Sequence, residues 1–359
     1  MNMIITILLL FFIIGLIVTI HEFGHFITAK KNGVYVSEFS IGMGPKIWGF
    51  KRKNDDTDYN VRLFPIGGFV AMAAKEGEID NKKLKKNQIL ENKKFSQKLL
   101  ILSAGIIFNY LLAIVLLFLN GLIFGSPLNK PTISNIVDGG AAFESGLLEG
   151  DTVISVDGTH ICTSSDLMIE LLSKKPREKY EVVVKNNGET RNLTLIPDVV
   201  KDENDEENLS FGFAIESKKE NGFFEAIKYS LSTTYYTTRT IFFTIVDMFR
   251  GQIKLNSLSG PVGMYTVVDQ VKTVGIENMI YLIAYLSINV GFLNLVPISV
   301  FDGGRILIVL IEKIFNKKVN ENVEGIISLI GFALLILLTV YVTFGDIVEL
   351  IKGWVVCKK

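Results

Sequence analysis

The sequence predicts a polytopic α-helical membrane protein with about four transmembrane helices and one inserted soluble α+β domain. Three observations support this class: four long apolar runs, a surplus of positive charge after the first run, and strand and turn patterns after the second. An apolar fraction of 49% would also suit a soluble protein. The clustering of the apolar residues is therefore what identifies a membrane protein.

Four charge-free runs define the predicted spans, and they cover 3–20, 99–124, 279–301 and 326–344. Each run is long enough for a helix to cross a hydrocarbon core about 30 Å thick. With flanking residues, the predicted transmembrane helices extend over 1–30, 99–124, 279–312 and 325–348. We do not expect the first run to be a cleaved signal peptide, because it lacks a basic leader and a small-residue cleavage site.

The distribution of charge predicts the orientation of the spans. Residues 30–98 contain fifteen Lys and Arg but eight Asp and Glu, and no Lys or Arg precedes residue 30. Because positively charged loops stay in the cytosol, residues 31–98 are expected on the cytosolic side, with both ends of the chain outside. Lys352, Lys358 and Lys359 weigh slightly against an external C-terminus. A formal net charge of zero gives no indication of nucleic-acid binding.

Residues 128–200 are expected to form a small extracytoplasmic domain after the second span. Gly and Asn turns separate three strand-like segments and one helical segment, namely VISV (153–156), YEVVVKN (180–186), RNLTLIP (191–197) and SSDLMIELLSKK (164–175). His160 is expected at the surface of this domain. The two cysteines, Cys162 and Cys357, indicate neither a disulfide framework nor a Cys-based metal site. The acidic run that follows predicts a solvated linker over 201–221.

The segment 222–278 admits two arrangements. Residues 222–250 are aromatic and amphipathic, but Glu225, Lys228 and Arg239 interrupt them. These charges favour a helix that lies at the membrane surface over one that crosses the bilayer. A crossing helix would invert the orientation of every later segment.

His21, Glu22 and His25 form an H-E-x-x-H sequence, HEFGH, at the end of the first apolar run. Residues i and i+4 share one face of a helix, so both imidazoles can bind the same metal ion. Glu22 lies about 100° round the helix, where it can exchange protons with a water at that metal. The motif also occurs by chance, but ionisable groups at membrane depth are costly and are usually functional.

A catalytic zinc ion is held by three protein side chains and keeps one position open, so a third ligand is needed. The chain contains three histidines, and the remaining one belongs to the soluble domain. A carboxylate is therefore expected, and the candidate is Asp302, which lies between two apolar runs in NLVPISVFDGGR (294–305). Pro297 and the glycines after Asp302 are expected to break the helix and allow a cleft. Alternatively, Asp-Gly-Gly merely ends the helix.

Together these segments resemble the site-two protease family of intramembrane zinc metalloproteases, in particular its bacterial branch with a PDZ domain. The matching segments follow the family's order: HEFGH (21–25), FSIGMGPKIWGF (39–50), RLFPIGGFVAM (62–72), LSAGIIFNYLLA (102–113), a PDZ-like segment (136–158), LSGPVGMYTVV (258–268) and NLVPISVFDGGR (294–305). They span nearly the whole chain, which makes the resemblance specific.

The resemblance implies that His21, His25 and Asp302 bind Zn²⁺ and that Glu22 is the catalytic acid and base. It further implies that the amide of Asn294 supports the substrate or the oxyanion, with Pro297 in the same substrate-binding loop. Residues 62–72 would belong to a membrane-associated β-loop that receives the substrate as an added strand. The β-loop residues expected to contact the substrate are Gly67, Gly68, Phe69 and Val70.

The implied activity is cleavage of the transmembrane segments of single-pass membrane proteins by a zinc-activated water. Anti-sigma factors and remnant signal peptides are the implied substrate classes. The protein would be a multi-pass protein of the cell membrane, in contact with the lipid bilayer, with its active site toward the cytosol and its PDZ-like domain outside. Two other functions are a non-catalytic PDZ scaffold and a metal transporter. The complete set of catalytic residues weighs against the scaffold, and the lack of internal repeats weighs against the transporter.

Overall fold

The computed structural model describes residues 2–74, 84–127, 130–172, 179–201, 207–216, 218–251 and 260–356. Within these residues, four helices are long and apolar enough to cross a membrane: α1 (Asn2–Lys31), α2 (Phe95–Phe124), α7 (Ile276–Leu295) and α9 (Glu321–Val356). The predicted class, a polytopic α-helical membrane protein, is confirmed. Residues 1–116 and 245–359 form one compact unit, and residues 117–244 form a second.

The first unit is organised around α1. Its N-terminal half packs against α7 and against α6 (Pro261–Val274), where Ile13, Val268 and Leu282 lie in one buried apolar cluster. Its C-terminal half lies close to α2, because Gly24 has no side chain: a Cβ atom there would lie 2.5 Å from the carbonyl oxygen of Ala104. This close approach brings the histidine-bearing turn of α1 next to α2.

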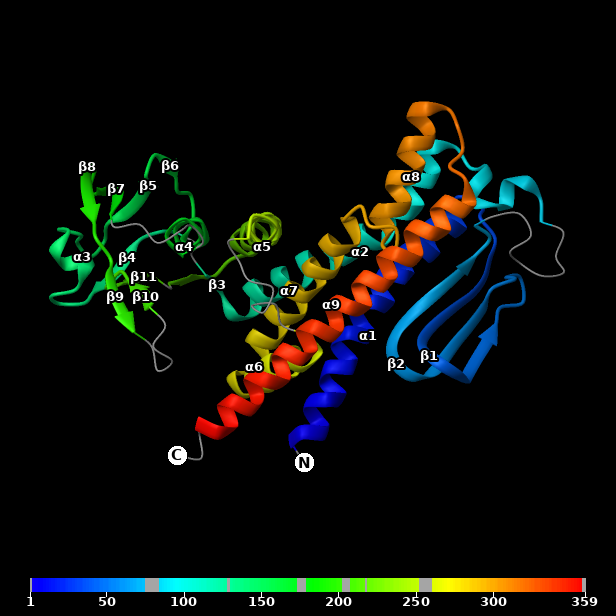
Figure 1. Ribbon diagram of the computed structural model, residues 1–359, viewed down its shortest axis with the longest axis horizontal. Coiled ribbons are helices and arrows are strands. Elements are labelled where there is room, and N and C mark those ends of the chain that lie inside the picture. Colours follow the sequence, from blue (N-terminus) through cyan, green and yellow to red (C-terminus); the bar gives the residue numbers. More distant parts are fainter. Residues whose placement is uncertain are drawn as a thin grey trace. The chain divides into compact units, whose positions relative to one another are not determined.

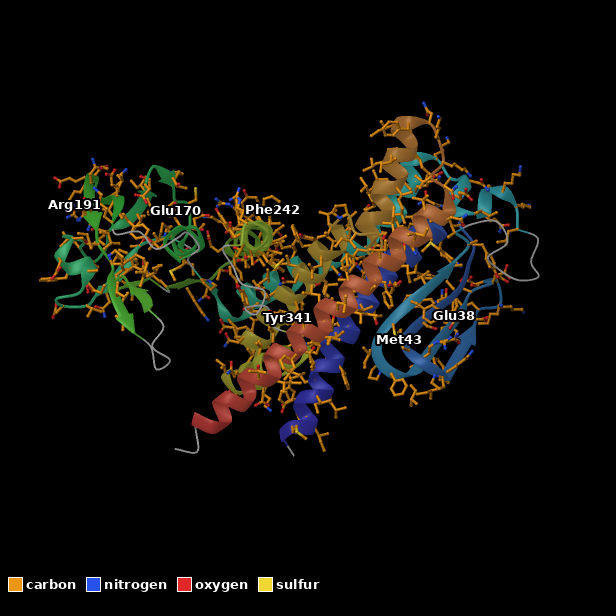
Figure 2. The ribbon with its side chains drawn as sticks, viewed as in Figure 1. Glu38, Met43, Glu170, Arg191, Phe242 and Tyr341 are labelled. Carbon is orange, nitrogen blue, oxygen red and sulfur yellow. The ribbon has the colours of Figure 1, made fainter. Side chains whose placement is uncertain are left out.

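A β-loop made of β1 (Val36–Lys51) and β2 (Asp58–Met72) lies against α1 (Figure 1). Residues 36–41 pair with 68–72 on one side, and residues 38–41 pair with 58–61 on the other. Residues 58–62 pair in turn with 46–51. The segment 68–72 is therefore an outer edge. Several large apolar side chains of the loop are exposed, among them Met43 (Figure 2), Ile47, Trp48, Phe50, Leu63 and Phe64.

The second half of β2 follows the helix axis of α1. A Cβ atom on Gly15 would overlap the carbonyl group of Pro65, and one on Gly68 would lie 3.9 Å from Cγ of Glu22. Two turns of α1 separate these contacts, so the edge segment runs along the helix toward its C-terminal end. Two short 3₁₀ turns, Lys86–Gln88 and Leu90–Asn92, then connect the β-loop to α2.

The predicted span 279–312 consists of two helices in the structure. α7 ends at Leu295, and α8 (Asp302–Phe315) begins after a six-residue turn that contains Pro297. Gly303 and Gly304 permit this turn, because a Cβ atom on either would overlap backbone atoms of the α7 end or of the turn. The break that the proline and glycines predicted is therefore present, and Asp302 becomes the first residue of α8.

α9 contacts the beginning of α6 through a buried carboxylate. Asp346 accepts hydrogen bonds from the backbone N–H groups of Gly260 and Gly263, at 3.2 and 2.8 Å. Pro261 occupies the first turn of α6, where its missing N–H is not needed. Asp346 thus caps α6 from another helix.

The second unit contains the predicted α+β domain. Its main sheet has the order β6-β5-β7-β8, formed by β5 (Thr152–Val156), β6 (Thr159–His160), β7 (Tyr180–Asn186) and β8 (Glu189–Leu195). Helices α3 (Ala141–Glu144) and α4 (Ser164–Leu172) accompany it. Arg191 on β8 (Figure 2) binds the buried carboxylate of Asp151 at 2.6 Å. His160 is exposed, as predicted, and Cys162 is a free, exposed thiol, whereas Cys357 lies outside the described residues.

The prediction of a solvated linker over 201–221 is wrong for most of its described residues. The described residues of this segment form three short strands. β10 (Glu207–Ser210) pairs with β9 (Asp198–Lys201), and β11 (Phe213–Ile215) pairs with β4 (Ile133–Ile136). β12 (Lys219–Glu220) pairs with β3 (Ser126–Pro127). Phe211 is buried in the domain core and Ile215 packs against it. These apolar residues, which alternate with others after the acidic run, explain the difference, because they need burial. Residues 202–206 lie outside the described part.

α5 (Phe223–Phe249) does not belong to the four helices, among those described, that are apolar enough to span a membrane. Arg239, one of the charges that interrupt its apolar sequence, forms an ion pair with the buried carboxylate of Asp166 at the start of α4. The same carboxylate accepts a hydrogen bond from the backbone of Thr163. A polar residue of α5 thus anchors this helix to the α+β domain.

Candidate active site

His21, His25 and Asp302 bring three ligand atoms together. Nε2 of His21 lies 2.9 Å from Oδ2 of Asp302, Nε2 of His25 lies 3.1 Å from the same oxygen, and the two nitrogens are 3.3 Å apart. All three atoms lie within 4.8 Å of one another, and the histidines are buried. The cluster thus joins two neighbouring turns of α1 to the first residue of α8. His25 and Asp302 are 277 positions apart in the sequence.

The tautomer of His25 is fixed by α2. Its Nδ1 lies 2.8 Å from the carbonyl oxygen of Ile101, which can only accept a hydrogen bond, so Nδ1 carries the proton. The Nε2 atom then presents a lone pair to the Asp302 carboxylate. With both Nε2 atoms unprotonated, the lone pairs that converge in this cluster repel one another, and a cation held among them would relieve that repulsion.

Asn109 on α2 contacts the other histidine. Its Nδ2 lies 3.3 Å from Nδ1 of His21, and its Oδ1 is buried without a hydrogen-bond partner among the described residues. A half-turn of the amide would direct Oδ1 to the histidine, where it could accept the Nδ1 proton and leave Nε2 free. The backbone of Asn109 is held in place, because its carbonyl oxygen accepts a hydrogen bond from Ser287 on α7.

Gly105 forms the wall of the site on α2. A Cβ atom at this position would lie 2.5 Å from Nε2 of His25 and 2.6 Å from Nε2 of His21. Any side chain there would occupy the space into which both ligand atoms point. The glycine therefore keeps open the side of the cluster where the two Nε2 atoms lie.

This set of donors fits zinc. Two imidazole nitrogens and one carboxylate oxygen form a known type of catalytic zinc site, which leaves a fourth position open. Bonds of about 2.0–2.1 Å in a tetrahedron place neighbouring ligand atoms about 3.3 Å apart, close to the separations of 2.9 to 3.3 Å in this cluster. The hydrogen bond from His25 to Ile101 supplies the outer-shell support that ligating histidines require.

Glu22 lies between the histidine cluster and the β-loop. The backbone of Val70 hydrogen-bonds its carboxylate, and its Cγ would be 3.9 Å from a Cβ atom on Gly68. In a β-strand the backbone groups of successive residues point to opposite edges. The Val70 contact therefore identifies the edge of 68–72 that does not pair with 36–41 as the edge that faces the site.

The residues predicted to bind substrate are placed differently from one another. The Val70 backbone contacts Glu22, and a Cβ atom on Gly68 would lie 3.9 Å from Cγ of Glu22, whereas Gly67, with φ of +80°, makes the bend before the edge segment. Phe69 lies under the guanidinium of Arg62, 5.0 Å from the ring centre. Asn294 donates a hydrogen bond to the carbonyl of Val290 in its own helix, at 3.0 Å. Pro297, in the turn before Asp302, is exposed.

Sequence reasoning missed two residues of the site, Gly105 and Asn109. Both lie in LSAGIIFNYLLA, which carried the family resemblance but received no chemical role. A polar amide in the middle of an apolar span was the available signal for Asn109, since such groups need a partner at membrane depth. For Gly105 no comparable signal exists, because small residues are common where membrane helices pack together.

Residues 9–338 match the sequence profile of Peptidase family M50. The chain is 32% identical to the regulator of sigma-W protease RasP of Bacillus subtilis, with 96% of this chain and 99% of the relative covered. It is 30% identical to the zinc metalloprotease RasP of Bacillus licheniformis (98% and 100% covered) and 30% identical to that of Shouchella clausii (96% and 99% covered). The profile match and these full-length similarities lead to one conclusion: the chain belongs to peptidase family M50.

Proposed function

We propose that this protein is a zinc-dependent intramembrane endopeptidase that cleaves the transmembrane segments of single-pass membrane proteins. One observation carries the proposal: the ligand atoms of His21, His25 and Asp302 converge within 4.8 Å, next to Glu22 and at the end of a membrane-spanning helix. Membership of a peptidase family and the names of the metalloprotease relatives support it.

In this proposal His21, His25 and Asp302 hold the zinc ion, with Asn109 and the Ile101 carbonyl orienting the imidazoles. When bound, zinc supplies a Lewis acid that polarises the scissile carbonyl and lowers the pKa of water to about 7. Glu22 takes a proton from the attacking water and delivers it to the departing amine.

Substrate binding is assigned to the edge of the β-loop. A helical substrate hides its carbonyl groups in hydrogen bonds four residues back, so it must unwind before it can be cut. The outer edge of 68–72 offers main-chain groups to such an unwound segment, and no other strand pairs with that edge in the described part of the chain. The Val70 backbone contact with Glu22 supports this assignment, because it places the edge beside the catalytic carboxylate.

Asn294 and Pro297 are proposed to shape the substrate site from the turn before α8. The Asn294 amide is a neutral donor that suits a developing oxyanion. Its present acceptor is the Val290 carbonyl, so this role requires the side chain to change partners when substrate binds.

The proposed orientation follows the charge distribution. The β-loop and the metal site lie toward the cytosol, and the α+β domain, which we infer to be a PDZ domain, lies outside the cell. α5 is proposed to lie at the membrane surface, as its sequence suggests. The Bacillus subtilis relative is named for the regulation of sigma-W, and this supports a membrane-bound anti-sigma factor as one substrate class, with remnant signal peptides as another.

The test uses the full chain in lipid vesicles with a model single-span reporter whose leucine-rich span is interrupted by Asn-Gly near its cytosolic end. We expect the wild-type protein to cut inside the span, and Glu22→Gln to retain zinc but not to cut. Mass spectrometry locates the cut, and elemental analysis measures zinc. If the protein binds zinc but no cleavage depends on Glu22, the result would favour the alternative function of a non-catalytic PDZ scaffold. Zinc uptake into vesicles that is lost in Asp302→Ala would favour the transporter.

A further inference from the structure

A cavity of about 270 Å³ lies beside the metal site in the first unit. Its apolar wall comes from the turn after the β-loop, from α2 and from α8, and consists of Leu90, Leu102, Ile308 and Val309. Its charged lining consists of Glu91, Lys98, Arg305, Glu312, Lys318 and Glu324. The wall can hold a hydrocarbon stem, and the charged lining can select the group at its end.

The cavity lies along α2, α8 and the chain after the β-loop, three of the elements that form the active site, whereas α1 contributes no lining residue. On α2, Leu102 in the wall lies one turn before Gly105, where an added Cβ atom would overlap both histidines. On α8, Arg305 lies one turn after Asp302. On the β-loop, Ala74 in the lining follows the edge segment, which ends at Met72.

An extended substrate on the edge segment would therefore reach this cavity. Ala74 lies four positions after Val70, which is beside Glu22, and a strand advances about 3.3 Å per residue. The substrate residue that enters the cavity is thus about three to five positions from the scissile bond. The edge segment runs toward the C-terminal end of α1, so this residue belongs to the flank on that side of the membrane, the cytosolic side in the proposed orientation.

Two cations in the cavity are available to a ligand. Lys318 forms an ion pair with Glu91, and Glu312 accepts a hydrogen bond from the backbone of Val319. Lys98 and Arg305, by contrast, form no ion pair among the described residues, although the lining also holds the carboxylates of Glu312 and Glu324. Two unpaired cations above an apolar wall fit a carboxylate on a short hydrocarbon stem.

We propose that this cavity is a specificity subsite that binds a Glu or Asp side chain on the cytosolic flank of the substrate. The inference rests on the proposed function, because it assigns a substrate feature to the same active site. Most single-pass proteins carry Lys or Arg at the cytosolic end of their span. Lys98 and Arg305 repel such flanks and attract acidic ones, so the subsite distinguishes substrates by an uncommon feature.

The experiment compares three reporters in vesicles with the zinc-loaded full chain. They carry Glu, Gln or Lys at the positions three to five residues from the mapped cut and are otherwise identical. We expect cleavage about fivefold faster with Glu than with Lys, and Gln in between, from the energy of a partly exposed ion pair. Arg305→Glu should reverse this order, whereas Lys313→Glu, an exposed change on the same helix outside the lining, should preserve it.

Equal rates for the three reporters in the wild type would overturn the subsite while leaving the protease intact. A uniform slowing of all three by Arg305→Glu would also overturn it, and would instead indicate a contact with lipid headgroups. Cleavage of the Gln reporter that depends on Glu22 tests the proposed function separately. Zinc content and thermal unfolding, measured for each variant, show whether the fold is retained.

A second measurement locates the substrate without catalysis. In Glu22→Gln protein with both natural cysteines changed to Ser, a cysteine at Ile308 in the cavity is tested for disulfide formation with a cysteine on the reporter flank. A cysteine at Ile330, exposed on α9, is the control. We expect crosslinking at Ile308, stronger for the flank with Glu than for the flank with Lys. Equal crosslinking at Ile308 and Ile330 would overturn the proposal even if no reporter is cut.

Discussion

The amide of Asn109 lies 3.3 Å from Nδ1 of His21, and both side chains are buried. This contact links the middle of α2 to a proposed zinc ligand on α1. The Nδ1 atom of each histidine therefore has a polar partner on α2. For His25 the partner is the backbone carbonyl of Ile101, and for His21 it is the side-chain amide of Asn109.

Loss of that amide should weaken zinc binding. We expect Asn109→Leu to reduce zinc affinity about 10- to 100-fold, because the imidazole of His21 loses the group that fixes its tautomer and ring orientation. Competition with a chelator measures the affinity directly. Asn289→Leu is the matched control, since Asn289 is also an asparagine in a span but donates a hydrogen bond to the Tyr285 carbonyl of its own helix. Equal affinities for the two variants would contradict the role of Asn109.

A methyl group at Gly105 should prevent zinc binding without unfolding the protein. Its carbon would lie 2.5 Å from Nε2 of His25, so Gly105→Ala must displace a ligand, at a cost of about 1–3 kcal/mol typical of overpacking. Gly345→Ala on α9 is the control, because nothing lies within 4 Å of its added carbon. Zinc content and cleavage should be lost in the first variant and retained in the second. Full zinc occupancy in Gly105→Ala would refute the prediction.

Removal of the Asp346 carboxylate should loosen α9 from α6. Asp346→Ala leaves two N–H groups at the start of α6 without an acceptor, which should lower stability by about 1 kcal/mol, the usual value of a helix cap. Thermal unfolding of the protein in detergent measures the change. Asp346→Asn retains one acceptor oxygen and should lose less. A stability equal to wild type in the alanine variant would mean that water replaces the cap.

The attachment of the β-loop to the end of α1 should depend on pH. Burial alone would raise the pKa of Asp55, but the Lys30 ammonium and hydrogen bonds from Thr57 and Tyr59 hold that pKa well below its ordinary value. Because the folded state favours the carboxylate, the stability it adds is present above the unfolded pKa of about 3.9 and is lost as the pH falls further.

We therefore expect faster hydrogen exchange in residues 52–60 at about pH 3 than at about pH 6, beyond the intrinsic effect of pH on exchange. Asp55→Asn should exchange fast at both values, so the difference should disappear. Asp58→Asn is the control, because that carboxylate is half exposed and lies 3.5 Å from Lys51. A pH-dependent difference that persists in Asp55→Asn would contradict the assignment.

The sequence predicted those features of the fold and site that depend on local patterns. The apolar runs predicted four spans, and the i, i+4 spacing of His21 and His25 predicted a shared face. Asp302 was identified because a carboxylate between apolar runs is costly unless it has a function. In each case the residues that determine the feature lie close together in the sequence.

The features that the sequence did not predict depend on how helices that are apolar on all sides face one another. α2 is apolar on all sides, so its sequence does not show that Gly105 and Asn109 face α1. The cap that Asp346 provides to α6 joins residues more than eighty positions apart. The incorrect linker over 201–221 has another cause: net charge dominated the interpretation, while the apolar residues around Phe211 determined the packing.

The path of the edge segment along α1, from Gly15 to Glu22, has a consequence for the other proteins of the membrane. Main-chain pairing along such an edge does not depend on the side chains of the partner. If substrates pair with this edge as proposed, a neighbouring span is protected first by the persistence of its own helix, and only a span that frays beside the edge can go on to be selected by its side chains. The stability of the neighbouring transmembrane helices against unwinding would then set how often an extended segment is available to pair with this edge.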